Sequence, residues 1–123
     1  MSDPNGILPS GILVGKGQSD LTLALRMANR HGLIAGATGT GKTVSLQVLA
    51  EGFAKAGVPV FLADVKGDLS GISQVGGDSP KAKERAEKLG LAGWQGDSFP
   101  VIYWDLFGQQ GHPIRTTDRK SVV

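Results

Sequence analysis

The chain has 123 residues, a formal net charge of +2, 40% apolar residues and no cysteine. This composition is typical of one small globular domain or of part of a larger one. The lack of cysteine excludes disulfides and thiolate metal sites, and the small charge gives no argument for binding to nucleic acid or to a membrane. No apolar run is long enough to span a bilayer and the N-terminus lacks a signal-peptide pattern, so a cytoplasmic location is expected.

The first part of the chain predicts a leader followed by a hairpin. Residues 1–10 contain two prolines and small polar residues, which indicate a flexible leader. Two short apolar runs follow, at 11–16 and 21–25, and the polar segment 17–20 separates them. This arrangement favours a β-hairpin.

The next part predicts a strand, a helix and a second strand. Residues 32–35 form a short apolar strand, and a helix is expected to begin at about Gly41. Apolar residues at helical spacing predict its inward face: Leu46, Leu49, Ala50 and Phe53. The polar residues Gln47, Glu51 and Lys55 are expected on the opposite face. Gly57 is suited to cap the C-terminus, and residues 60–63 are apolar without alternation, as in a buried parallel strand.

The second half predicts a short polar helix and one more strand. Ser79 is suited to the N-cap of a helix that ends at Leu89, before Gly90, and an apolar strand follows at 101–104. The helix carries four cations, Lys81, Lys83, Arg85 and Lys88, for which a solvated face is favoured over a nucleic-acid surface. Alternating strands and helices with fully apolar strands predict an α/β fold, with a parallel sheet and flanking helices.

Residues 36–43 fit the phosphate-binding motif G-x-x-x-x-G-K-[ST] at every fixed position. The predicted nucleotide-binding residues are Gly36, Ala37, Thr38, Gly39, Thr40, Gly41, Lys42 and Thr43. The glycines allow the backbone to wrap a phosphate, and the N–H groups at the start of the helix attract the anion. Lys42 is the predicted catalytic residue because it can reach the β- and γ-phosphates, and the Thr43 hydroxyl can ligate Mg²⁺. ATP and Mg²⁺ are the expected cofactors. The alternative is a glycine-rich turn without a ligand, which would not need Lys and Thr at those positions.

Two aspartates follow apolar runs at the expected C-terminal ends of strands, Asp64 and Asp105. Strand ends of this kind lie on the ligand side of a parallel sheet, so either carboxylate could help to hold Mg²⁺. Asp64 is favoured because its strand follows the phosphate-loop helix directly. The alternative is that each aspartate only begins a turn. His31 and His112 have no second ligand at metal spacing and are expected to be structural or surface residues.

Three segments resemble the HerA-like helicases, a branch of P-loop ATPases that includes HerA and the FtsK-type DNA pumps. The segments are 32–43, with the phosphate loop; 63–68, with an Asp-x-Lys-Gly-acid pattern; and 104–117. The last is similar to a bacterial HerA-like subgroup. The likeness covers nearly all of residues 12–117.

The resemblance implies a partial RecA-like P-loop fold, preceded by the hairpin, and ATP rather than GTP. It implies a helicase or translocase motor on DNA and ring-shaped homo-oligomers, often hexamers, with no membrane partner. It also places the Walker B acid and the catalytic Glu beyond Thr117, so that Asp105 is not the Walker B acid. The chain alone is then expected to bind nucleotide weakly and not to hydrolyse it.

Residues 118–123 match what a common sequencing-library adapter encodes when it is read to its first stop codon. We therefore expect residues 11–117 to be the N-terminal part of the ATPase domain and 118–123 to be a non-native tail. A natural polar C-terminus is the alternative.

Two other functional classes stay open. One is a P-loop kinase or GTPase, although no guanine-reading Asn-Lys-x-Asp segment is present among these residues. The other is a non-catalytic module that binds nucleotide as an assembly switch.

Overall fold

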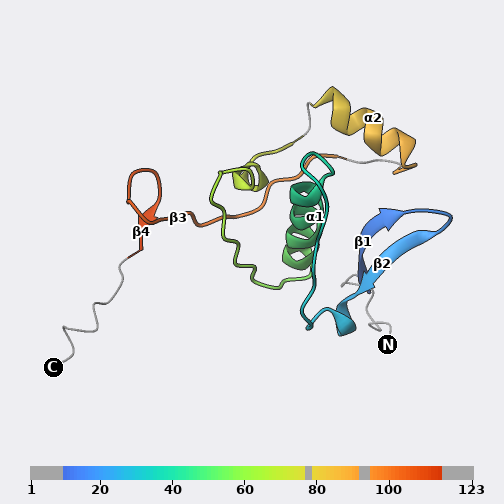
Figure 1. Ribbon diagram of the computed structural model, residues 1–123, viewed down its shortest axis with the longest axis horizontal. Coiled ribbons are helices and arrows are strands. Elements are labelled where there is room, and N and C mark those ends of the chain that lie inside the picture. The colour runs from blue at the N-terminus through green and yellow to red at the C-terminus, as the bar shows by residue number, and fades with distance from the viewer. Residues whose placement is uncertain (1–9, 77–78, 92–94, 115–123) are drawn as a thin grey trace.

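The computed structural model describes residues 10–76, 79–91 and 95–114. The predicted tail at 118–123 and nearly all of the predicted leader lie outside these residues. Within them the chain forms a mixed α/β arrangement around one long helix (Figure 1). No helix in the described part of the chain is both long and apolar enough to cross a membrane.

The predicted N-terminal hairpin is confirmed. Strands β1 (Gly11–Lys16) and β2 (Asp20–Ala24) pair antiparallel, from Gly11 opposite Ala24 to Lys16 opposite Asp20. A bulge between Leu13 and Gly15 shifts the register by one residue. A short 3₁₀ turn, η1 (Leu25–Met27), then leads the chain away from the hairpin.

The central helix α1 (Lys42–Lys55) begins one residue after the predicted start and ends as predicted. At its C-terminus Gly57 adopts a φ of 76°, the Gly57 N–H donates to Ala54 O and the Val58 N–H donates to Phe53 O. These two bonds form a Schellman motif, which satisfies carbonyls that the last turn leaves without partners. Gly57 supplies the left-handed conformation that the motif requires.

The second helix α2 (Pro80–Lys88) ends in the same way. The Gly90 N–H donates to Glu87 O, the Leu91 N–H donates to Ala86 O, and Gly90 has a φ of 63°. Ser79 is the N-cap residue, as predicted, although its side chain makes no capping bond. Its carbonyl instead accepts the N–H groups of Ala82 and Lys83.

The predicted inward face of α1 is only partly buried. Ala50 is buried, Leu49 and Phe53 are half-buried, and Leu46 is exposed. On the opposite face Glu51 is half-buried. The reason is the segment before β3, where Asp97 lies 3.6 Å from the Lys55 ammonium and the Phe99 ring lies 5.5 Å from it.

The three predicted parallel strands do not pair with one another in the described residues. Segments 32–35 and 60–63 have no ladder partner, and only Trp104 of the third segment lies in a strand. That strand, β3 (Trp104–Asp105), pairs in parallel with β4 (His112–Pro113), a two-residue ladder. Leu33 is 89% exposed and Phe61 is 83% exposed, so these apolar segments lack the covering that a sheet interior provides.

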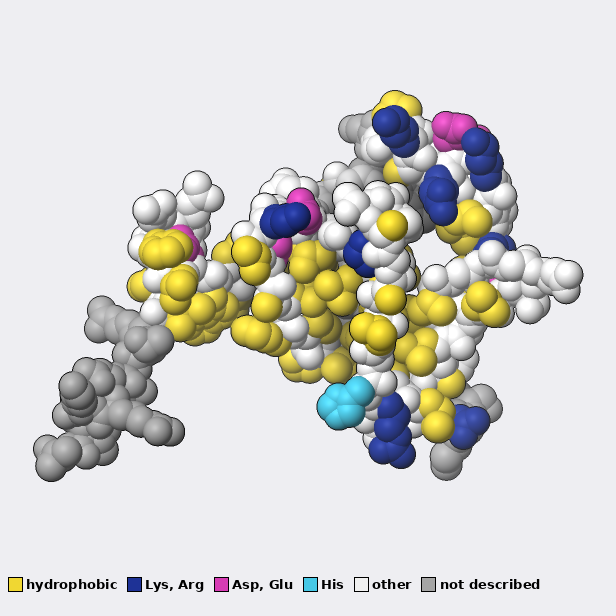
Figure 2. Space-filling view, in the orientation of Figure 1, with side chains coloured by type: hydrophobic (Ala, Val, Ile, Leu, Met, Phe, Trp, Pro, Cys, Tyr) yellow, Lys and Arg dark blue, Asp and Glu magenta, His cyan; other side chains and the backbone are white. Residues whose placement is uncertain are grey.

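Few side chains in the described residues are buried. They are Ile12, Ala50, Leu69 and Ala86. Hydrophobic side chains accordingly cover much of the face seen in Figure 2. Within this small core β1 packs against α1 at Ile12 and Gly52. A Cβ on Gly52 would lie 2.5–2.9 Å from three side-chain carbons of Ile12.

We predict that Gly52→Ala lowers the melting temperature of the full chain. Alanine is the better helix former by roughly 1 kcal/mol, but overpacking against a stiff β-branched neighbour costs about 1–3 kcal/mol. The measurement is thermal unfolding followed by circular dichroism. In an Ile12→Ala background the added methyl has room, so there Gly52→Ala should be neutral or stabilising. Equal losses in both backgrounds would show that the two residues are not coupled.

Candidate phosphate-binding site

The predicted phosphate loop forms a glycine-hinged turn that leads into α1. Gly39 and Gly41 have φ values of 79° and 92°, and Gly41 is the residue at the N-cap of the helix. Only glycine adopts this conformation readily, so Gly41 of the motif and Gly39, at one of its variable positions, reverse the chain direction without strain. Gly36 meets a different constraint, because a Cβ there would lie 2.5 Å from Thr40 Oγ1.

The N-terminus of α1 is open to an anion. No side chain caps it, and no acidic residue lies in its first turn. The N–H groups of this turn and the positive end of the helix dipole therefore face outward without a competing negative charge. This is the electrostatic arrangement that favours a phosphate.

The Ala37 carbonyl holds the loop closed. It accepts a 2.6 Å hydrogen bond from Lys42 Nζ and a 2.7 Å bond from Thr40 Oγ1. Lys42 is thereby held over the loop rather than extended into solvent. An arriving phosphate would compete with the Ala37 oxygen for the same ammonium.

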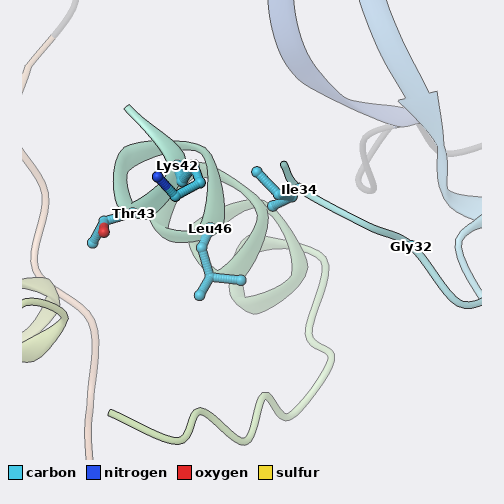
Figure 3. A pocket seen from close by; sticks show the side chains of 5 residues that line it. All are labelled: Gly32, Ile34, Lys42, Thr43 and Leu46. Atoms are coloured by element: carbon cyan, nitrogen blue, oxygen red, sulfur yellow. The ribbon is translucent and has the colours of Figure 1, made fainter. Parts of the chain in front are cut away.

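A shallow hollow of about 350 Å³ lies beside this loop. Lys42 and Thr43 reach it from the first turn of α1 and Leu46 from the next, while Gly32 and Ile34 line it from the neighbouring segment (Figure 3). The segment before the loop therefore lies alongside the helix after it, as in a strand–loop–helix unit. The structure brings Lys42 and Thr43 together at this hollow, and Asp64 is not among its lining residues.

The Asp64 carboxylate organises the loop that follows it. Oδ1 accepts the N–H groups of Lys66 at 3.1 Å and Gly67 at 2.9 Å, and Oδ2 accepts that of Leu69 at 2.9 Å. These backbone bonds, first of all the one from Leu69, hold the pKa of Asp64 below its usual range. Gln47 of α1 donates to Asp68 O at 3.3 Å, which connects the loop to the phosphate-loop helix.

Asp105 behaves in the same way at the next loop. Its carboxylate accepts the N–H groups of Phe107, Gln109 and Gln110, and these bonds, the one from Gln110 foremost, lower its pKa. Both aspartates thus begin turns, the alternative that the sequence left open. At Asp64, Oδ2 accepts a single backbone bond and keeps a lone pair for another donor.

His31 and His112 do not belong to a cluster of metal-ligating residues in the described part of the chain. In the described segments no group of three or more His, Asp or Glu residues is arranged to hold a metal ion. The His112 ring lies 6.3 Å from the Trp104 ring, which is a packing contact between β4 and β3.

Sequence reasoning missed two contacts between segment 99–103 and the turn at 70–73. Tyr103 donates from its hydroxyl to Ser70 O at 2.6 Å, and its hydroxyl lies equally close to Ser73 Oγ. The Phe99 N–H donates to Ile72 O, so the segment before β3 lies along the 3₁₀ turn η2 (Ser70–Ser73). No local pattern signals a bond between a tyrosine and a serine about 30 residues away.

We predict that Asp64→Ala loosens the 64–69 loop. The amides of Lys66, Gly67 and Leu69 should exchange hydrogen faster, because each loses its acceptor. Asp68→Ala is the matched control, since its carboxylate accepts none of these bonds. The lowered pKa of Asp64 also sets how the stability of the loop depends on pH. The ionised carboxylate stabilises the loop fully above the ordinary Asp pKa of about 4, and this stabilisation is lost as the pH falls through the lower pKa of the folded state. Unchanged exchange in Asp64→Ala would contradict the assignment.

The chain was compared with known proteins at the levels of family, curated relative and solved structure. The family described as Helicase HerA-like C-terminal matches residues 10–120. No curated protein and no solved structure gave a match. The matched range contains the hairpin, the phosphate loop with α1, and both aspartate-organised loops. The chain therefore belongs to the HerA-like helicase C-terminal family.

Proposed function

We propose that this chain is the ATP-binding part of a HerA-type P-loop ATPase, which in the full-length protein drives a helicase or translocase motor on DNA. The observation that carries the proposal is the uncapped N-terminus of α1, entered through two left-handed glycines and flanked by Lys42 and Thr43. Family membership supports ATP hydrolysis as the activity of the whole protein.

In this proposal each loop residue has a distinct role. The backbone of residues 36–41 surrounds the phosphates, and Lys42 leaves the Ala37 carbonyl to bind the β- and γ-phosphate oxygens. Thr43 supplies a hydroxyl ligand to Mg²⁺, which neutralises the developing charge when bound. Asp64 would help to hold the ion with Oδ2, which accepts a single backbone bond.

We also propose that, in the full-length protein, segments 32–35, 60–63 and 101–104 are strands of a parallel sheet of RecA type. Their support is an apolar sequence, exposure of Leu33, Phe61 and Ile102, and the position of the first segment against α1. By the family resemblance, the Walker B acid and the catalytic Glu belong to strands beyond Thr117. The full-length protein then acts as a ring-shaped homo-oligomer.

We predict that Lys42→Ala weakens ATP binding by about 10- to 100-fold, since a charge-assisted bond to phosphate contributes roughly 1.5–3 kcal/mol. Titration of the full chain with a fluorescent ATP analogue measures this loss. Lys81→Ala is the control, because it removes an exposed lysine of α2, outside the predicted phosphate loop at 36–43. ATP affinity that survived Lys42→Ala unchanged would refute the phosphate-loop assignment.

Thr43→Ala should abolish the gain in ATP affinity that Mg²⁺ produces, because the hydroxyl ligand is lost. Thr43→Ser keeps a hydroxyl at the same position and should retain the gain. The same titration, run with Mg²⁺ and with a chelator, separates the two variants. If alanine and serine behaved alike, Thr43 would not be a ligand of the ion.

A further inference from the structure

The helix α2 has two unlike faces. Ala82, Ala86 and Leu89 recur at i, i+4 and i+7 and turn inward, with Ala86 buried. Lys81, Arg85 and Lys88 recur at the same spacing on the outer side, and all three are exposed. At about 100° per residue these cations lie within one narrow stripe of the helix surface. We name Lys81, Arg85 and Lys88 the α2 basic stripe.

Two members of the stripe are not neutralised. Among the described residues, Lys81 and Arg85 have no acidic partner, whereas Lys88 is paired with Glu84 at 2.5 Å. Figure 2 shows dark blue side chains gathered around α2, with few acidic side chains among them. Helix α2 carries four cations and two glutamates, so its nine residues hold a net charge of +2, as large as the formal net charge of the whole chain.

The structure adds a fourth cation that the sequence does not place near this helix. Lys16 is the last residue of β1, and its ammonium lies 4.0 Å from the position that a Cβ on Gly90 would occupy. Gly90 follows the end of α2 by two residues. Lys16 also contacts Asp20 at 3.4 Å, which keeps its side chain at this place. Lys16 thus adds a cation at the C-terminal end of α2, from a segment about 70 residues away in the chain.

We propose that the α2 basic stripe, extended by Lys16, binds the phosphate backbone of DNA. This inference rests on the proposed function, because a motor that moves along DNA must bind the DNA. Seven residues of helix rise by about 10 Å, which matches about three phosphates at the 3.4 Å axial spacing of one strand. Exposed cations on one stripe, two of which have no acidic partner among the described residues, fit contact with the phosphate backbone and not base readout. Binding is accordingly independent of sequence and sensitive to salt.

The test is fluorescence anisotropy of labelled duplex DNA with the full chain, without nucleotide, at several salt concentrations. The variant is Lys81→Gln with Arg85→Gln, which removes both unpaired cations and keeps good helix formers. The matched control is Arg26→Gln with Arg30→Gln, which removes the same charge from exposed positions outside α2. Circular dichroism checks that both variants keep the helix content of the parent.

The expected result is an α2 variant that binds at least about tenfold more weakly, with a salt slope reduced by about two, while the control keeps the parent slope. Equal losses in both variants, or no loss in the α2 variant, would overturn the proposal. Binding of poly-glutamate in place of DNA, with the same dependence on α2, would assign the surface to an acidic protein instead.

Lys42→Ala separates this inference from the proposed function. Its ATP titration tests the phosphate loop alone, whereas the nucleotide-free DNA titration of the α2 variant tests only the basic stripe. If ATP binding survives Lys42→Ala, the proposed function fails and the α2 result stands. If Lys42→Ala weakens ATP binding but the α2 variant binds DNA as tightly as the parent, only this inference fails.

Discussion

The arrangement of this chain depends on one backbone constraint, the reversal of direction at Gly39 and Gly41. Two positive φ angles within three residues turn the chain from segment 32–37 into α1, which then runs alongside the segment it came from. Any residue with a Cβ would be strained at these positions. The reversal leaves the first N–H groups of α1 outward and places Lys42 and Thr43 beside the same hollow. The candidate site is thus made by backbone geometry before any side chain contributes.

Around this site, aspartate carboxylates hold the loops in place, a role that apolar packing has in most proteins. The described part of the chain buries four residues, too few to fix the positions of long loops. Asp64 and Asp105 each gather three backbone N–H groups of the loop that follows, and each loop keeps its shape through one side chain. Gln47 and Tyr103 then tie neighbouring segments together by single hydrogen bonds. Polar anchors therefore hold in place segments whose apolar side chains face outward.

Local chemistry explains which features the sequence could predict. The helix ends at Gly57 and Gly90, the hairpin and the phosphate-loop turn all depend on residues close together in the chain, and the structure agrees with them. The parallel sheet is different, because its ladders need partners far away along the chain, and in the described residues segments 32–35 and 60–63 have none. The half-burial of Glu51 could not be foreseen either, since the segment near Asp97 that causes it is distant in sequence. The roles of Lys42, Thr43 and Asp64 stay predictions for the titrations to decide.

The contact between Ile12 and Gly52 has a consequence for how such proteins can vary. Replacing a glycine in the middle of a helix with alanine ordinarily stabilises the protein, because alanine is the better helix former. Here the side chain of Ile12 occupies the space that a methyl group would need. A larger residue at position 52 is therefore acceptable only together with a smaller one at position 12. In an alignment of related chains the two positions should change as a pair, so that the docking of the hairpin on α1 is recorded as covariation across 40 residues of sequence.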